Sequence, residues 1–517
     1  MADNRNRNRG LLSVLFLLAL SSCKGLIFKF HPYEYKIMPK EDVALVDNGV
    51  YYKPNSFAKS YEDVFRSHPV KARKRINLDV KGDVNLLVLP VEFSDYKADL
   101  LDGNNGEDAH KIIQNAFFGK EEVTQWHSVA SFYDASSYGK LKIRGEVAPW
   151  FELDEDYSIA KINDPANIGK DKQTITKEIL RRAVAHYKRE NPDKISNFDL
   201  NNDGVIDAVY LIYTHPIKIN RDETTSLFWA YSAFDNMDSH NVELEGPPPY
   251  ANAYSWSSFE FMRVNNSLFK NKPDAHAYIH ESGHLLGLPD YYNTNLNSKD
   301  NPLGGFDLMD YTVGDHTGLS KMFLDWTYPH VITGPGEITL RPFTKTGDLA
   351  LVTNNWNGSA VDEYLLLEFY APIGLNRLDS FINTTFNLPS DFGLKVYHVD
   401  ARTIFVDQSS TPYTFYYSNG QERPENLLEE LAHSNSDAGP FKGKFTGIPL
   451  YKLLEASGEN TFVNGEKATN ETLFKDGLVF GRDVFADFSF NSKGDLPFNF
   501  EVVKITKDSI TIRFTSH

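Results

Sequence analysis

One short stretch of sequence limits what this chain can be. Beginning at residue 280 it reads HESGHLLGLPD, with two histidines four positions apart and a glutamate directly after the first. Four residues are about one turn of an α-helix, so the imidazoles of His280 and His284 share one face and can reach a single cation. Glu281 can then project toward a water molecule on that cation and take its proton. The pattern predicts a metal-binding helix that carries its own general base.

The residues around this pattern favour a third ligand. Asp274 follows a proline and is expected to cap the start of the helix. Gly287 can adopt the left-handed conformation that ends a helix, and the reversed chain would then bring Asp290 to the metal. Two nitrogens and one oxygen leave a fourth position open for water, as in a catalytic zinc site. His276 lies one turn earlier on the same face, and we expect it to pack beside the site rather than bind the metal.

A second segment, GGFDLMDY at residues 304–311, resembles the Met-turn of metzincin peptidases. In that motif a methionine lies beneath the metal as an apolar floor, and here it would be Met309. Tyr311 stands where some metzincins keep a tyrosine that reaches the metal or the oxyanion. The alternative is that Met309 fills a gap in the core, as methionine commonly does.

An acidic segment at residues 199–207, DLNNDGVID, follows the first nine positions of a calcium-binding loop. Its oxygen-bearing side chains at positions 1, 3, 5 and 9 are those of Asp199, Asn201, Asp203 and Asp207. Position 12 is Tyr210 instead of a bidentate glutamate, so the loop is not a complete EF-hand. The alternative to a calcium site is a turn whose polar side chains bind their own backbone.

The first 23 residues have the pattern of an export signal. Three arginines precede an apolar run, LLSVLFLLAL at residues 11–20, which is too short to span a bilayer. Small residues then precede Cys23, the single cysteine of the chain, as in the lipobox of bacterial lipoproteins. We therefore expect an exported protein that is anchored to a bacterial membrane through an acylated Cys23 and faces the cell surface or the periplasm. An extracellular location is also open. The alternative is an ordinary cleaved signal with a chance cysteine.

The rest of the chain divides by its texture into three parts. Residues 24–80 have weak periodicity and contain the basic cluster KARKR at residues 71–75, which indicates either a linker or a propeptide with a processing site. Apolar runs predict strands at residues 86–93 and 206–213, and helical spacing predicts helices at 125–135, at 175–190 and after Pro273. Residues 331–517 show alternating apolar runs between turns, which predict a mostly antiparallel β domain.

Composition excludes two classes of protein. The chain has 53 Lys and Arg against 70 Asp and Glu, a net charge of −17, which disfavours binding to the phosphates of a nucleic acid. No apolar stretch reaches the roughly 18 residues that a membrane-spanning helix requires.

Taken together, the motifs resemble the immune inhibitor A family of secreted zinc metallopeptidases. The resemblance covers about residues 80–517 and is carried by LVLPVEFSD, SFYDASSYGKLKIRGEV, HESGHLLGLPDYY, GGFDLMDY, LSKMFLDW, GLKVYHVD and YKLLEASGE. It implies an α+β fold, with a metzincin-like catalytic domain at residues 81–330 that contains a twisted mixed sheet, a backing helix and the active-site helix. It also implies that His280, His284 and Asp290 bind zinc, that Glu281 is the general base and acid, and that Tyr311 stabilises the tetrahedral intermediate.

Three functions follow from these observations. The first is a zinc endopeptidase that hydrolyses protein or peptide substrates. The second is an inactive, adhesin-like binding module that keeps the fold of a peptidase. The third is a zinc amidase or a sugar-active hydrolase, which the resemblance disfavours. The intact set of His280, Glu281, His284 and Asp290 favours the endopeptidase, because a binding module has no need of Glu281.

Overall fold

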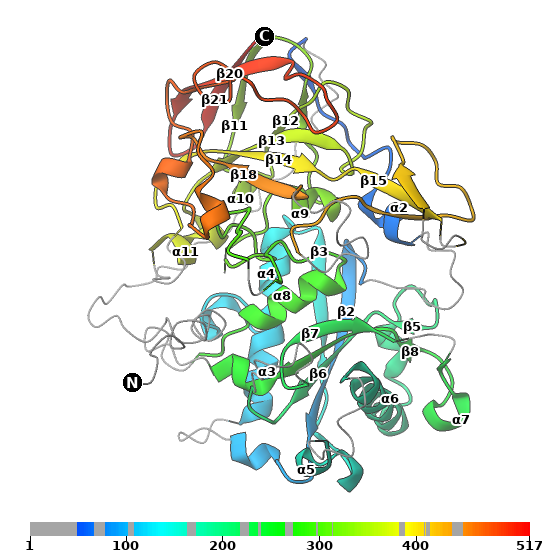
Figure 1. Cartoon of the computed structure of the whole chain (residues 1–517). Coiled ribbons are helices and arrows are strands. Elements are labelled where there is room, and N and C mark those ends of the chain that lie inside the picture. The colour runs from blue at the N-terminus through cyan, green and yellow to red at the C-terminus, as the bar shows by residue number, and fades with distance from the viewer. Residues whose placement is uncertain are drawn as a thin grey trace, which may run out of the picture. The chain divides into compact units, whose positions relative to one another are not determined.

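The computed structural model of the chain is shown in Figure 1. It describes residues 49–66, 78–101, 108–162, 172–217, 227–235, 239–263, 272–295, 298–312, 314–381, 388–407, 409, 414–436 and 448–516. These residues fall into two compact units. The first unit draws on Val70–Ala135 and Gly139–Gly287, and the second on Ser136–Tyr138, on Leu288–His517 and on residues 49–66.

The first unit is built on a mixed sheet. Its strands, in spatial order, are β3 (Leu141–Val147), β2 (Gly82–Glu92), β6 (Ala208–Tyr213), β9 (Ala253–Ser258) and β7 (Tyr231–Phe234), with β4 (Phe151–Glu152) beside β2. All neighbours are parallel except β7, which runs antiparallel to β9 and ends the order. The sheet therefore has one antiparallel strand along an edge.

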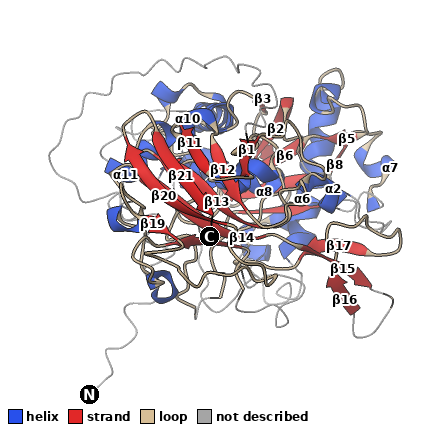
Figure 2. Ribbon diagram, turned by 90° about the horizontal axis from the view of Figure 1, so that it is seen from above, coloured by secondary structure: helices blue, strands red, loops and turns tan. Residues whose placement is uncertain are grey.

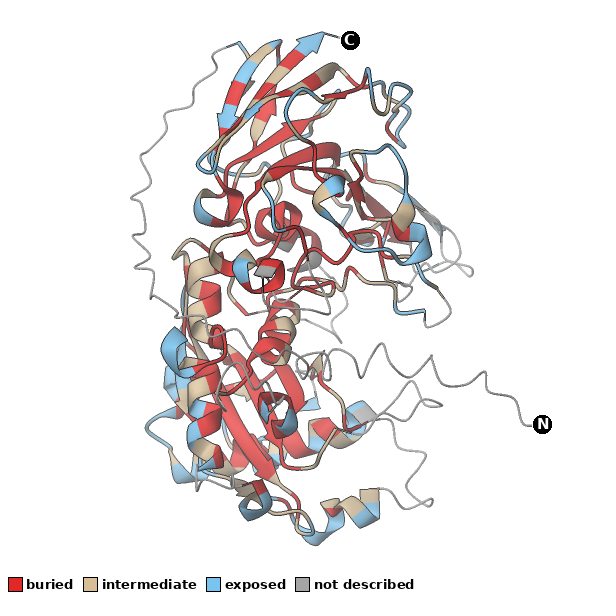
Figure 3. Ribbon diagram, turned by 90° about the vertical axis from the view of Figure 1, so that its left-hand side faces the viewer, coloured by how far each residue is buried: buried red, intermediate tan, exposed pale blue. Residues whose placement is uncertain are grey.

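The two faces of this sheet differ in chemistry. Side chains alternate between faces along a strand, and the face that includes Val209, Leu211 and Trp256 packs into an apolar core with α6 (Lys172–Glu190). The opposite face includes Tyr210, whose hydroxyl reaches α8 (His276–Leu285). The centre of the sheet is buried on both sides, as Figure 3 shows.

Shorter elements complete the first unit. They are α3 (Ala109–Phe118), α4 (Val129–Ser136), α5 (Ile159–Ile162), α7 (Val242–Glu245), the strand pair β5 (Val205–Ile206) and β8 (Tyr250–Ala251), and the 3-10 helices Ala98–Leu101, Glu121–Val123, Glu155–Tyr157, Ile195–Phe198 and Phe259–Arg263. Helix α3 packs against β3, and α8 packs against β7 and β9. The metal-binding pattern of the sequence thus lies on a helix that is supported by the edge of the sheet.

The second unit is rich in strands. Its largest sheet has the order β1 (Tyr51–Tyr52), β10 (His330–Ile332), β12 (Leu349–Val352), β13 (Glu363–Tyr370), β14 (Gly393–Asp400) and β18 (Tyr451–Leu454). Its neighbours are antiparallel except β10 and β12. Residues 49–66, which fall in the segment expected to be a linker or propeptide, contribute β1 and α2 (Tyr61–Arg66) to this unit.

Two smaller antiparallel sheets belong to the same unit (Figure 2). One has the order β11 (Gly336–Leu340), β21 (Ile510–Ser516), β20 (Phe498–Ile505) and β19 (Val479–Phe480), and the other β16 (Thr414–Tyr417), β15 (Thr403–Asp407) and β17 (Leu428–Leu431). The remaining helices are α9 (Gly318–Phe323), α10 (Phe343–Thr346), α11 (Arg377–Phe381) and the 3-10 helices Gly374–Asn376, Thr461–Asn464 and Asn470–Thr472. The four-stranded and six-stranded sheets share one apolar core, as two packed β-sheets do.

Several expectations from the sequence are met. The chain has mixed α and β structure with a strand-rich C-terminal part, and the strand predicted at residues 86–93 forms most of β2. The helices predicted at 125–135 and 175–190 correspond to α4 and α6. The predicted signal at 1–23, Cys23 and the basic cluster at 71–75 lie outside the described residues. The domain limits at 24–80, 81–330 and 331–517 stay predictions.

Within the described part of the chain, no helix combines the length and the apolar character that crossing a bilayer requires.

Candidate metal centre

Helix α8 begins one residue later than a cap at Asp274 would give, and it ends before Gly287 as the sequence predicts. The Asp274 carboxylate accepts a hydrogen bond from the backbone N–H of His276 at 2.9 Å, although the residue at the cap position is Ala275. At the other end the N–H of Gly287 donates to the carbonyl of His284 at 3.0 Å, and Gly287 has a φ of 103°. This positive φ, which glycine adopts without a steric penalty, turns the chain out of the helix toward Asp290.

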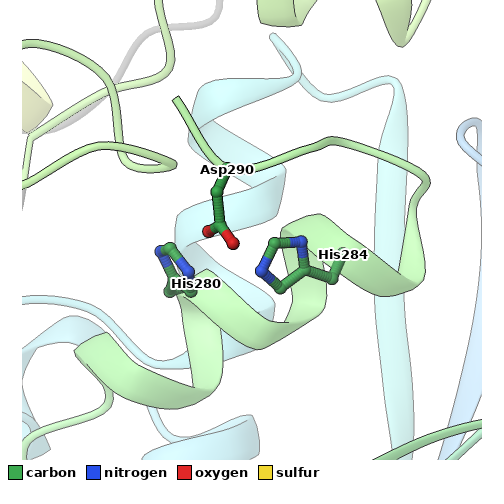
Figure 4. A group of neighbouring side chains, drawn as sticks. All are labelled: His280, His284 and Asp290. Atoms are coloured by element: carbon green, nitrogen blue, oxygen red, sulfur yellow. The ribbon is translucent and has the colours of Figure 1, made fainter. Parts of the chain in front are cut away.

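The turn brings three side chains together. One ligand atom from each of His280, His284 and Asp290 lies within 4.8 Å of the other two. Figure 4 shows both imidazoles rising from α8 and the Asp290 carboxylate pointing between them from the segment that follows. Within the described residues, this is the one group of at least three histidine, cysteine, aspartate or glutamate side chains that is close enough to hold a metal ion.

The chemistry of this group fits zinc. Zinc binds imidazole nitrogen and carboxylate oxygen at about 2.0–2.2 Å, so neighbouring ligands of a tetrahedral site lie about 3.4 Å apart. Starting from 4.8 Å, the ligand atoms need to approach one another by 4.8 − 3.4, or at most about 1.4 Å. Small side-chain rotations cover that distance. All three side chains are half-buried, so the site keeps contact with solvent.

The carboxylate of Glu281 has the hydroxyl of Ser232 as a partner. The residue is buried, and its Oε2 accepts a hydrogen bond from the Ser232 hydroxyl at 2.9 Å. The same hydroxyl lies 3.0 Å from the backbone oxygen of Glu281. Sequence reasoning did not single out Ser232, because a lone serine in a short strand carries no signal of its own.

Hydroxyl groups attach α8 to the elements beneath it. Tyr133 on α4 donates to the carbonyl of Ile279 at 2.7 Å, and Tyr210 on β6 donates to the carbonyl of Tyr278 at 3.0 Å. Tyr210 also contacts the hydroxyl of Ser282. These bonds fix the rotation of the helix about its axis, and with it the direction of the two candidate imidazole ligands.

His276 is placed as expected, near the start of α8 and outside the three-ligand group. Its Nδ1 contacts the Asp274 carboxylate, and its ring stacks on Trp126 with the centroids 5.0 Å apart. Burial, with a smaller electrostatic contribution from His276, lowers the pKa of the neighbouring His127 to about 3. The two histidines are therefore part of a packed cluster at the base of the helix.

The predicted Met-turn, residues 304–311, contains both Met309 and Tyr311. Met309 is fully buried, and its carbonyl accepts a hydrogen bond from the N–H of Tyr291 at 2.8 Å. Burial, with smaller electrostatic contributions from Asp310 and Asp290, raises the pKa of Tyr311 to about 12. The Tyr311 phenol is thus close enough to Asp290 to sense its charge, and it keeps its proton at neutral pH.

The loop that carries Met309 is held by a residue that the sequence did not reveal. Asp307 accepts hydrogen bonds from the N–H of Met309 at 2.9 Å, from the N–H of Thr317 at 2.7 Å and from the hydroxyl of Ser320 at 2.8 Å. It also lies 3.2 Å from Nδ1 of His316. An aspartate in a glycine-rich turn usually bonds its own neighbours, so nothing in the sequence indicated these longer contacts.

The acidic loop at residues 199–207 uses its oxygens on backbone groups. The bonds run from the N–H of Gly204 to Asp199, of Asp203 to Asn201, of Val205 to Asp203 and of Asn85 to Asp207. Burial raises the pKa of Asp207 to about 6. These contacts are those of the polar-turn alternative, and calcium binding stays a prediction.

Known proteins resemble this part of the chain. The profile described as "Immune inhibitor A peptidase M6, catalytic domain" matches residues 74–321. Immune inhibitor A of Bacillus thuringiensis subsp. alesti is 24% identical over 430 residues, which are 77% of this chain and 59% of that protein. The pre-pro-metalloprotease PrtV of Vibrio cholerae serotype O1 (strain M66-2) is 21% identical over 198 residues, 35% of this chain and 21% of that protein.

One solved structure, wild-type OgpA from Akkermansia muciniphila, aligns with 70% of this chain and 85% of its own at 13% identity, with a TM-score of 0.20. The chain spans 59% of the length of immune inhibitor A and 21% of that of PrtV. The family profile includes all three candidate ligands, Glu281 and Tyr311. Residues 74–321 are therefore similar to the catalytic domain of the immune inhibitor A family of M6 metallopeptidases.

Proposed function

We propose that this protein is an exported zinc endopeptidase, with His280, His284 and Asp290 as the zinc ligands. The observation that carries the proposal is the convergence of these three side chains within 4.8 Å on a solvent-accessible segment. Two imidazoles and one carboxylate are a donor set that catalytic zinc sites use with a fourth position left for water. The match of residues 74–321 to a peptidase family profile supports a metallopeptidase and therefore protein or peptide substrates.

Each of the other site residues has a distinct role in this proposal. A bound zinc ion would lower the pKa of a coordinated water and polarise the substrate carbonyl. Glu281 accepts a proton from the attacking water and returns it to the leaving amine, as a general base and then a general acid. Tyr311, with its pKa raised to about 12, remains a hydrogen-bond donor for the developing oxyanion. Met309 is proposed as the apolar floor of a metzincin-type site.

The substrate is proposed to bind as an extended strand along β7. This strand pairs with β9 on one side only among the described residues, and it packs against α8. A peptide added to such an edge gains main-chain hydrogen bonds, and its side chains then supply specificity. The peptide would lie beside Glu281, because Ser232 of β7 touches that residue.

Export and anchoring are also part of the proposal. The signal pattern of residues 1–23 and the lipobox ending at Cys23 support an acylated protein on a bacterial membrane. One relative is named a pre-pro-metalloprotease, a precursor form, which supports export but not anchoring. Labelling cells with a radioactive fatty acid tests it: the wild type incorporates the label and Cys23→Ser does not.

Calcium is proposed for the loop of Asp199, Asn201, Asp203 and Asp207 as a stabilising ion. The spacing of the side-chain oxygens supports it, and the hydrogen bonds to the backbone support the alternative. Thermal unfolding separates the two: a calcium site gives a rise in the unfolding temperature with added calcium that Asp203→Ala abolishes.

Hydrolysis of casein and of a mixed peptide library tests the main proposal. The wild type is expected to cleave both, to lose activity with a zinc chelator and to regain it with added zinc. Glu281→Gln should keep its zinc and lose at least about a hundredfold in kcat, because a proton acceptor is removed. Glu243→Gln, an exposed substitution on α7, is the matched control and should act like the wild type. Zinc binding without hydrolysis by the wild type would favour the binding module instead.

A further inference from the structure

We propose that Ser232 is a positioning residue for Glu281, holding the carboxylate in the orientation that the proposed proton transfer requires. The inference rests on the proposed function, since it concerns the same reaction. It adds a residue that neither the metal-binding pattern nor the Met-turn contains. The Ser232 hydroxyl contacts both the backbone oxygen and Oε2 of Glu281.

The topology places Ser232 where it can act on the site. Strand β7 forms the antiparallel edge of the sheet, and Ser232 is paired in register with Ser255 of β9. Residues directly opposite in an antiparallel pair point to the same face, and α8 packs against both strands. Ser232 is half-buried whereas Glu281 is buried, so the buried carboxylate has its hydroxyl partner on a partly exposed strand residue.

The two contacts together restrict Glu281. The Ser232 Oγ lies 2.9 Å from Oε2 and 3.0 Å from the backbone oxygen of the same residue. A glutamate side chain has three rotatable bonds, and a free carboxylate could adopt several rotamers. A rotamer that carries Oε2 away from the backbone oxygen of Glu281 cannot keep both contacts with one hydroxyl. The serine therefore favours a side-chain conformation in which Oε2 of Glu281 stays near the backbone oxygen of the same residue.

A serine that only joined β7 to α8 would not need a bond to the Glu281 carboxylate. Contact with the backbone oxygen alone would join β7 to α8, as Tyr133 and Tyr210 join α8 to other elements through backbone oxygens. Ser232 also bonds Oε2 of Glu281, which is the group proposed to move the proton.

Kinetics of three single variants of the full-length, zinc-loaded protein test the role. Ser232→Ala should lower kcat about tenfold, because misplacing a reacting group slows the chemical step, while KM and zinc content stay within twofold of the wild type. Ser232→Thr keeps the hydroxyl and should restore most of kcat. The control, Ser257→Ala, removes a buried hydroxyl on the adjacent strand that lies 3.3 Å from Ser255. It should leave kcat within twofold of the wild type.

Unfolding temperatures of the metal-free protein give a readout that does not depend on activity. Ser232→Ala, Glu281→Ala and the double variant form a cycle that isolates the contact between the two side chains. The double variant should lose less than the sum of the two single losses. An additive cycle together with an unchanged kcat for Ser232→Ala would overturn the proposal. An inactive wild type would instead overturn the endopeptidase function, and the cycle would still decide whether Ser232 holds Glu281.

Discussion

The Asp307 carboxylate accepts a hydrogen bond from the backbone N–H of Thr317 at 2.7 Å and so joins the loop of Met309 to the start of α9. Asp307→Asn replaces one acceptor oxygen with an NH2 group that faces donors. We expect a loss of about 1–3 kcal/mol in the free energy of unfolding, because a buried donor is left without an acceptor. Urea unfolding measures it. Asp508→Asn, an exposed turn residue, is the control and should change stability by less than about 0.5 kcal/mol.

Acid should weaken the same loop. Burial alone would raise the pKa of Asp307, but the hydrogen bond and charge of His316, with the N–H of Met309, lower it to about 2. Because the folded-state pKa is below the unfolded value of about 3.9, the carboxylate stabilises the fold above pH 4, and this contribution is lost as the pH falls toward 2. The wild type should lose about 2 kcal/mol more stability than Asp307→Asn between pH 5 and 2. Parallel pH profiles for the two proteins would contradict this assignment.

The bend after α8 provides a test of how Asp290 is positioned. Gly287 has a φ of 103°, where an alanine is strained, so Gly287→Ala should cost about 1–2 kcal/mol and move Asp290 away from the histidines. Gly477 has a φ of 82° with open space around it, so Gly477→Ala carries comparable strain elsewhere. We expect both variants to lose stability, and Gly287→Ala alone to bind zinc more weakly in titrations against a competing chelator. Equal zinc affinity in the two variants would mean that the bend does not position the ligand.

Local signals explain why the metal-binding helix could be predicted from the sequence. Two histidines one turn apart, an aspartate near the helix start and a glycine after its end all act over short distances. The structure differs in one detail, because Ala275 and not Asp274 occupies the cap position. The apolar run of β2 and the helical spacing of α6 are likewise local patterns with enough length to identify the element.

The residues that escaped prediction depend on long-range contacts. Ser232 and Glu281 are 49 positions apart in the chain, and their contact exists because β7 forms the sheet edge beside α8. Asp307 gains its role from Thr317 and Ser320 across a fold of the loop. Neither residue carries a spacing that would reveal its partner before the topology is known.

Tyr311→Phe tests the proposed oxyanion donor. The pKa of Tyr311 is raised to about 12, firstly by burial, so the phenol stays protonated throughout the usual assay range. Removing the hydroxyl should leave zinc content unchanged and lower kcat by about tenfold or more, since a donor to the developing charge is lost. Tyr416→Phe, on an exposed strand residue, is the control. If Tyr311→Phe lost zinc instead of rate, the phenol would be a structural support for Asp290.

Removing one partner of the buried ion pair of Glu368 and Lys395 should reduce stability more than replacing both partners with apolar residues. The two residues are register partners on β13 and β14, form an ion pair, and each has a side chain only 2% exposed. Glu368→Ala leaves the lysine charge buried and unpaired, for an expected loss of about 3–5 kcal/mol in urea unfolding. The double variant Glu368→Leu, Lys395→Met removes both charges at similar volume. It leaves one N–H, that of Gly318, without the Glu368 oxygen 3.0 Å away, so it should lose only about 1–3 kcal/mol. A double variant as unstable as Glu368→Ala would show that the carboxylate acts mainly through Gly318 rather than through the lysine.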